Sequence, residues 1–339
     1  MIIDIHQLLT EIEEEEILNR IIIKGRIKGE KASFLSGLDL LSTEKILLKY
    51  KPELIMKMNG SSETALRSAM RRAAHQIMDD PKIFSDPLAF RIVGADNQSA
   101  QHLDPRLLEQ TQVESRYRAF LAARSRYAED QLHIAIKRGV HQYVILGAGL
   151  DTFAYRNPYP DDVLHVFEVD HPATQTWKQE LLKEANIQMP RTLTFTPVNF
   201  ETETLGEGLR RAAFDAGRCA FFSWLGVTSY ITISAFTATL RFVASRPSGS
   251  GIVFDYMISP SLLNPTARNV FDNLAYRVAL AGEPFQNFFD PSLLKNDLQT
   301  MGFREIEDLG PKELNDLYFR ERADKLKVGS LAHIMNAIV

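Results

Sequence analysis

Short apolar runs alternate with stretches of helical periodicity along most of the chain. The runs lie at residues 142–146, 163–167, 219–227 and 251–256, and the more mixed segments 191–197, 303–309 and 332–338 also suit strands. Apolar residues at helical spacing precede the first run, at Ala128, Leu132, Ala135 and Ile136, and lie between later runs, as at Trp177, Leu181 and Leu182. That spacing places them on one face of a helix that packs against a sheet. Strands alternating with helices predict an α/β fold.

The turn after the first run is the strongest candidate for a ligand site. Tyr143 to Leu146 lead into Gly147, Ala148 and Gly149, followed by Asp151. Glycines permit a tight turn and let backbone amides approach a ligand, and in doubly wound sheets this turn lies at the carboxyl edge where ligands bind. A lone Gly-x-Gly also occurs in ordinary strand-to-helix turns.

The second run supports the ligand interpretation because it ends in acids. Glu168 and Asp170 stand where a ribose would present its hydroxyl groups, which suits both nicotinamide and adenosyl cofactors. A nicotinamide fingerprint has a third small residue where this chain has Thr152. The turn therefore favours S-adenosylmethionine.

Residues 1–60 form a predicted small α+β unit of their own. An apolar stripe of helical spacing precedes Glu13 to Glu16, two short β-rich pieces follow, and Ser42 is a plausible N-cap of the next helix. Asn59 to Ser62 provide a linker. The order of these elements resembles the docking domains of nonribosomal peptide synthetases, which implies an assembly-line protein as a partner of residues 1–58. The alternative is a helical cap on the catalytic domain.

Composition narrows the classes of partner. The chain has 339 residues, of which 45% are hydrophobic and 24% charged, and its net charge is −4. Scattered basic residues and a slightly acidic balance argue against nucleic acid as a partner. The single cysteine, Cys219, cannot form an internal disulfide, which fits the cytoplasm. We expect neither a signal peptide nor a membrane span, because the start is acidic and no window approaches 18 apolar residues.

Four ordered motifs carry a family resemblance. They lie at residues 73–89, 124–130, 144–156 and 167–172. Together they resemble the bacterial, S-adenosylmethionine-dependent branch of the leucine carboxyl methyltransferase family, over roughly residues 65 to 339. This resemblance implies a class I methyltransferase domain over residues 61–339, with a Rossmann-like seven-stranded sheet, a terminal antiparallel strand pair and a helical lid.

The resemblance also implies roles for particular residues. It assigns the methionine carboxylate of the cofactor to Arg124, which we expect at the start of a helix, where the alternative is a solvated arginine. Asn199 and Phe200 stand where the family usually has an acid and Phe beside the adenine. Ser223 and Trp224 could contact the cofactor, although an aromatic residue here is more often part of the core. Many relatives have Glu in place of Leu225.

The resemblance predicts methyl transfer from S-adenosylmethionine to an oxygen, above all a carboxylate, of a small molecule or a carrier-bound intermediate. An insertion over residues 259–291, together with the segment before Arg124, is expected to cover the substrate. A hydroxyl acceptor would need a general base, for which His75, His171 and Tyr230 are unranked candidates. The histidines show no metal-ligand spacing. Hydroxyl methylation, methylation of a protein C-terminus and a non-catalytic binding scaffold stay as alternatives.

Overall fold

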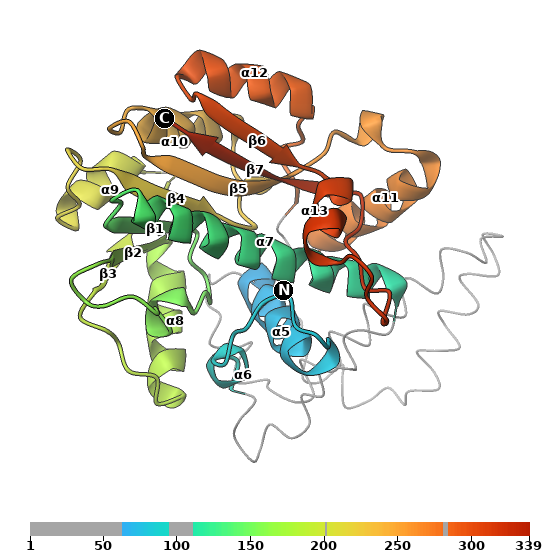
Figure 1. Cartoon of the computed structure of the whole chain (residues 1–339), viewed down its shortest axis with the longest axis horizontal. Coiled ribbons are helices and arrows are strands. Elements are labelled where there is room, and N and C mark those ends of the chain that lie inside the picture. The colour runs from blue at the N-terminus through green and yellow to red at the C-terminus, as the bar shows by residue number, and fades with distance from the viewer. Residues whose placement is uncertain (1–62, 95–110, 201, 281–283) are drawn as a thin grey trace, which may run out of the picture. The chain divides into compact units, whose positions relative to one another are not determined.

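A computed structural model describes residues 63–94, 111–200, 202–280 and 284–339, without the side chains of residues 63, 277 and 280. The predicted unit of residues 1–60 and its linker to Ser62 lie outside the described residues. The described part of the chain is drawn in colour in Figure 1.

The described strands form one seven-stranded sheet in the order β3-β2-β1-β4-β5-β7-β6 (Figure 1). Strands β1 to β5 pair in parallel, and β7 pairs antiparallel with both β5 and β6. The predicted α/β sheet and its terminal antiparallel pair are therefore confirmed. The strand bounds are β1 Gln142–Leu146, β2 His165–Asp170, β3 Leu193–Pro197, β4 Ala220–Trp224, β5 Gly251–Met257, β6 Glu305–Leu309 and β7 Ala332–Ile338.

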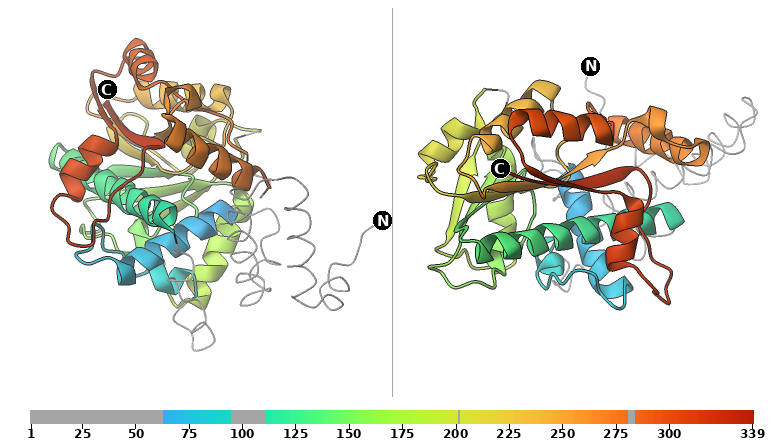
Figure 2. Two further views of the ribbon diagram at one scale, coloured as in Figure 1. Left: turned by 90° about the vertical axis from the view of Figure 1, so that its right-hand side faces the viewer. Right: turned by 45° about the horizontal axis from the view of Figure 1, so that its top comes forward.

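Helices cover both faces of the sheet (Figure 2). The long α7 and the short α13 pack into one core cluster with inward residues of β1, β2 and β4 such as Tyr143, Val166 and Phe221. On the opposite face, α9, α10 and α12 pack around Val144 and Phe222. The helix bounds are α5 Glu63–Met78, α6 Ala89–Ile92, α7 Gln112–Lys137, α8 Pro172–Glu184, α9 Leu205–Arg211, α10 Ile233–Ala244, α11 Pro265–Leu280, α12 Pro291–Met301 and α13 Pro311–Tyr318, with short 3₁₀ turns at η3 Phe153–Tyr155 and η4 Pro260–Leu262.

One helix start differs from the sequence prediction. Helix α7 begins at Gln112, where Thr111 and Glu114 form a capping box, so Arg124 lies in the middle of the helix and not at its start. The segment before Arg124 is thus helical from residue 112 onward. Helix α9 is capped by Thr204, again with a capping box.

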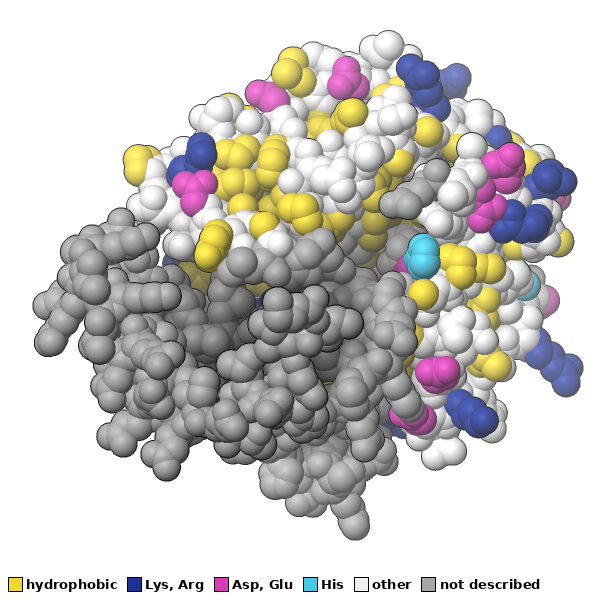
Figure 3. All heavy atoms as spheres, turned by 180° about the vertical axis from the view of Figure 1, so that it is seen from behind, with side chains coloured by type: hydrophobic (Ala, Val, Ile, Leu, Met, Phe, Trp, Pro, Cys, Tyr) yellow, Lys and Arg dark blue, Asp and Glu magenta, His cyan; other side chains and the backbone are white. Residues whose placement is uncertain are grey.

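The insertion between β5 and β6 contains η4 and α11. Its later part is joined to the loop after β4, because the Gln286 and Asn287 amides both donate to the Ser229 carbonyl. In the described part of the chain, none of the helices has the length and apolar character that crossing a membrane requires. Figure 3 shows basic and acidic side chains interspersed on the described surface of the face opposite to that in Figure 1.

Candidate active site

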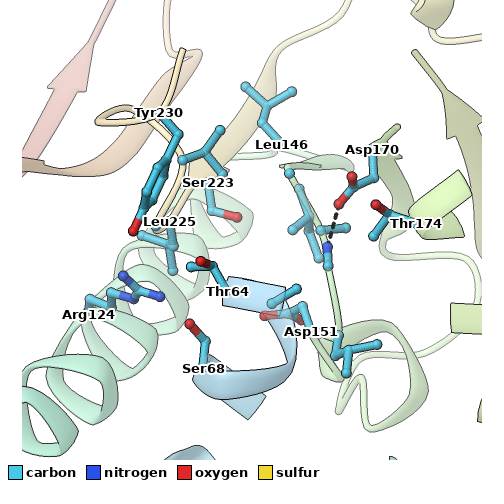
Figure 4. Close-up of a pocket in the computed structure, with 18 of the residues that line it drawn as sticks. Thr64, Ser68, Arg124, Leu146, Asp151, Asp170, Thr174, Ser223, Leu225 and Tyr230 are labelled. Atoms are coloured by element: carbon cyan, nitrogen blue, oxygen red, sulfur yellow. Dashed lines mark hydrogen bonds between the residues drawn. The ribbon is translucent and has the colours of Figure 1, made fainter. Parts of the chain in front are cut away.

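A cavity of about 360 Å³ lies at the carboxyl edge of the sheet, beside the turn after β1 (Figure 4). Ser223, Leu225 and Tyr230 lie on one side of the cavity and Asp170 and Thr174 on the other (Figure 4). The volume lies in the range of small-molecule and cofactor sites. The described lining residues are Thr64, Ala65, Ser68, Arg72, Leu121, Arg124, Ser125, Ile145 to Asp151, Asp170, Thr174, Ser223, Leu225 to Val227, Tyr230, Pro284 and Gln286.

The glycine turn has a backbone that other residues would strain. Gly147 has φ of +64° and Gly149 φ of +44°, both in the left-handed region. A β-carbon on Gly147 would lie 2.3 Å from the Cγ2 atom of Val227, so the turn and the loop after β4 approach closely only without a side chain. The Ala148 amide donates to the Val169 carbonyl (3.1 Å), which ties the turn to β2.

Asp170 fixes the end of β2 against this turn. One of its carboxylate oxygens accepts from the Gly149 amide (2.6 Å) and the other from the His171 amide (2.7 Å). Burial raises the pKa of Asp170, and the two amide hydrogen bonds act in the opposite direction. The carboxylate lines the cavity and presents a negative charge there.

Arg124 enters the cavity from the middle of α7, on the side of Tyr230 (Figure 4). Its Nη1 donates to Oδ2 of Asp255 (2.7 Å) at the end of β5. Burial acts to lower the pKa of Arg124, but Asp255, together with Tyr117 and Tyr230, outweighs it, and the net pKa is raised. The guanidinium is therefore a fixed positive charge at the opposite side of the cavity from Asp170.

A second arginine, Arg72 of α5, also lines the cavity, and the sequence analysis did not name it. It donates to the Leu150 carbonyl and to Asp86, a fully buried carboxylate that also accepts from the Thr152 hydroxyl (2.8 Å). Arg156 lies 3.6 Å from the same carboxylate. Asp86 belongs to the motif at residues 73–89, which is the signal that could have pointed to this support of the glycine turn.

Glu168, the other predicted acid, is fully buried and is not among the described lining residues. Its Oε2 lies 2.7 Å from Nζ of Lys178, which is 1% exposed, and the Tyr155 hydroxyl donates to the same oxygen. Burial raises the pKa of Glu168 to about 7, although Lys178 acts to lower it. The Glu168 carboxylate thus contacts Lys178 of α8 and Tyr155 of η3, outside the described cavity lining.

Three other predicted contacts lie outside the described lining. Trp224 is 1% exposed and its ring stacks on Phe236 at a centroid distance of 5.5 Å. Asn199 and Phe200 follow the end of β3, and Phe200 packs against the core cluster on the α9 and α10 face. Contact of these three residues with a cofactor stays a prediction.

Of the three candidate bases, only Tyr230 lines the cavity in the described part of the chain. His75 is buried in α5, where its Nδ1 faces Asp79 (2.6 Å) and its Nε2 accepts from the amides of Ile83 and Phe84. His171 is the exposed N-cap of α8, where its Nδ1 accepts from the Ala173 amide. The hydrogen bonds of both histidine rings therefore serve the local structure of α5 and of the start of α8.

The strand order, the glycine turn after β1 and the acid at the end of β2 are those of the class I methyltransferase fold. The sequence model of leucine carboxyl methyltransferases matches residues 65–244. A putative S-adenosylmethionine-dependent methyltransferase of Bacillus subtilis is 34% identical over 303 residues, which cover 84% of this chain and 99% of that protein. A Mycobacterium avium protein with the same description is 33% identical over 182 residues, or 51% of this chain and 57% of that protein.

Human N-acetylserotonin methyltransferase, solved with S-adenosylmethionine, is similar at 12% identity and a TM-score of 0.42, over 84% of this chain and 69% of that one. The chain belongs to the leucine carboxyl methyltransferase family. It is an S-adenosylmethionine-dependent methyltransferase.

The cavity residues fit this cofactor. Gly147 and Val227 both line the cavity, and a β-carbon at Gly147 would clash with Val227, so only a bare turn keeps this part of the wall in its present shape. Arg124 offers a positive charge to a carboxylate, and Asp170, at the other side, offers an anionic acceptor to hydroxyl groups. An amino acid group at one end and a ribose at the other match this arrangement of charges.

Proposed function

We propose that this enzyme methylates a carboxylate of a small molecule and releases a methyl ester. The observation that carries the proposal is the composition of the cavity beside β4. There the described lining residues are Ser223, Leu225, Gly226, Val227 and Tyr230, without a histidine or a carboxylate. A carboxylate has a reference pKa of roughly 4 and is ionised at neutral pH, so it attacks without a general base.

When bound, S-adenosylmethionine supplies an electrophilic methyl group on a positively charged sulfur. The chain's own contribution is to position the acceptor and to exclude competing groups. The Ser223 hydroxyl accepts a hydrogen bond from the Tyr143 hydroxyl (2.8 Å), and burial raises the pKa of Tyr143 well above its ordinary value. Neither group can take a proton usefully at neutral pH. Leu225 adds no negative charge that would repel an entering anion.

We also propose that the acid can be presented by an assembly-line protein that residues 1–58 recruit. The order of elements predicted from residues 1–60 supports this part of the proposal. The family match that begins at residue 65 is compatible with an additional unit before the catalytic domain. This recruitment is separable from the chemistry, because a free acid would bypass it.

The test is a set of matched acceptors that share one carbon skeleton and differ only in ending as an acid, an alcohol or an amide. Intact-mass screening should show the gain of one methyl group on the acid alone. Mild alkali or hydroxylamine should then remove it, because an ester is cleaved and a methyl ether survives. A stable product, or a rate that climbs with pH as a phenol titrates, would transfer the assignment to hydroxyl methylation and make Tyr230 the base to mutate.

The same screen separates the remaining alternatives. Methylation of peptides that end in a free carboxylate, without turnover of small acids, would indicate a protein substrate. Binding of S-adenosylmethionine without any methylated product across the set would indicate a binding scaffold.

A further inference from the structure

Asp255, at the end of β5, makes three contacts that converge behind the cavity wall. Its Oδ2 accepts from Arg124 of α7 (2.7 Å), and its Oδ1 accepts from the Gly226 amide in the loop after β4. Its backbone carbonyl accepts from the Thr228 hydroxyl (2.6 Å) in the same loop. Asp255 is 7% exposed and is not among the described lining residues, whereas Arg124 and Gly226 both are.

The position of the Arg124 guanidinium also depends on Gly226, which lies against it. Gly226 has φ of +76°, and a β-carbon there would lie 2.7 Å from Nη2 of Arg124 and 3.0 Å from its Nη1. The bare backbone therefore lets the guanidinium lie flat against the loop. With Nη1 engaged by Asp255, the planar fork has one defined orientation in which its other donors can meet a ligand.

We propose that Asp255 is a positioning residue for cofactor recognition: it orients Arg124 toward the carboxylate of the amino acid end of S-adenosylmethionine. The buried carboxylate selects one rotamer of a long side chain, so the entropy of ordering the guanidinium is lost on folding and not on binding. This inference concerns the cofactor and is independent of which acceptor is methylated.

Two ligands separate this role from a general structural one. S-adenosylhomocysteine carries the amino acid carboxylate, whereas methylthioadenosine contains the adenosine and thioether portions but lacks that carboxylate. Asp255→Asn keeps an oxygen that can face Gly226 but turns the interaction with Arg124 unfavourable. In calorimetry, Asp255→Asn should bind S-adenosylhomocysteine about tenfold or more weakly than the wild type, as expected for a disturbed charge-assisted contact. Its affinity for methylthioadenosine should stay within about twofold of the wild type.

Gly226→Ala is an independent variant, because it leaves both charges in place and displaces the guanidinium sterically. This variant should also weaken the binding of S-adenosylhomocysteine more than that of methylthioadenosine. It keeps the proposal testable if Asp255→Asn fails to fold. In an Arg124→Lys background, Asp255→Asn should add little further loss, since residues that act as one unit are not additive.

Asp308→Asn is the matched control. Asp308 accepts from the Tyr256 hydroxyl (2.8 Å) and faces Nδ1 of His333 (2.9 Å) at the antiparallel end of the sheet, outside the described cavity lining. Loss of the Asp308 carboxylate should leave the ratio of the affinities for S-adenosylhomocysteine and methylthioadenosine unchanged. The proposal would be overturned if Asp255→Asn and Gly226→Ala weakened the binding of both ligands equally. It would also be overturned if the folded variants bound S-adenosylhomocysteine as tightly as the wild type.

Discussion

Glu168→Gln should change how stability depends on pH, because the substitution removes a buried titratable group and keeps its shape. The carboxyl is fully buried, and burial raises its pKa in the folded state from the ordinary 4.5 to about 7. Between these values the folded state holds a proton that the unfolded state has released. The contribution of Glu168 is therefore fully present below about pH 4.5 and is lost as the pH rises through about 7.

The magnitude follows from the two pKa values. They differ by about 2.5, and each pKa unit corresponds to about 1.36 kcal/mol, which gives about 3 kcal/mol of stability lost across this window. The glutamine variant cannot titrate at this position. The free energy of unfolding of the wild type minus that of the variant should therefore fall by about 3 kcal/mol between about pH 4.5 and 7.5.

Urea unfolding at matched ionic strength measures this difference directly, since groups remote from residue 168 and its partner Lys178 titrate alike in both proteins and cancel. Glu203→Gln is the control: a hydrogen bond from Arg211 lowers the pKa of Glu203, so its contribution is lost only as the pH falls toward and below the ordinary value. A difference between wild type and Glu168→Gln that stays constant over the whole range would refute the buried-carboxyl reasoning.

Three further predictions concern the site and the domain boundary. Gly147→Val should abolish S-adenosylmethionine binding in calorimetry, because the new side chain would meet Val227 at 2.3 Å; Gly139→Ala, at φ of +92° with no atom within 4 Å, controls for backbone strain. Asp170→Asn should weaken the cofactor about tenfold by loss of an anionic acceptor, and an affinity within about twofold of the wild type would contradict its role. A chain starting at Ser62 should methylate a free acid at an undiminished rate and lose only delivery by a partner; inactivity on the free acid would indicate a structural cap.

The strands were the most predictable part of the fold. Each predicted strand segment overlaps a strand of the structure. The signal is clearest for β1 and β4, which are buried along their whole length, because a strand buried on both faces needs continuous apolar residues. Helix starts were harder to predict. Arg124 was expected near a helix start, although Thr111 and Glu114 already form the pattern of a capping box and the helix begins at Gln112.

The site was predictable where local motifs form it and unpredictable where the sheet order does. Gly147, Gly149 and Asp170 could be placed together because β1 and β2 follow one another in chain and sheet. Arg124 and Asp255 are 131 residues apart, and no local pattern pairs them. Their contact requires the end of β5 to lie beside the loop after β4, which only the assembled sheet provides.

The support of the glycine turn by Asp86 and Arg72 has a consequence for the order of folding events. These hydrogen bonds join residues 66 and 78 positions apart, so they form only after β1 and α5 have come together. Contacts of such sequence separation carry a loop-closure cost that a local turn does not. The turn therefore acquires its final shape only together with the docking of α5, and the ability to bind S-adenosylmethionine should appear no earlier than that step.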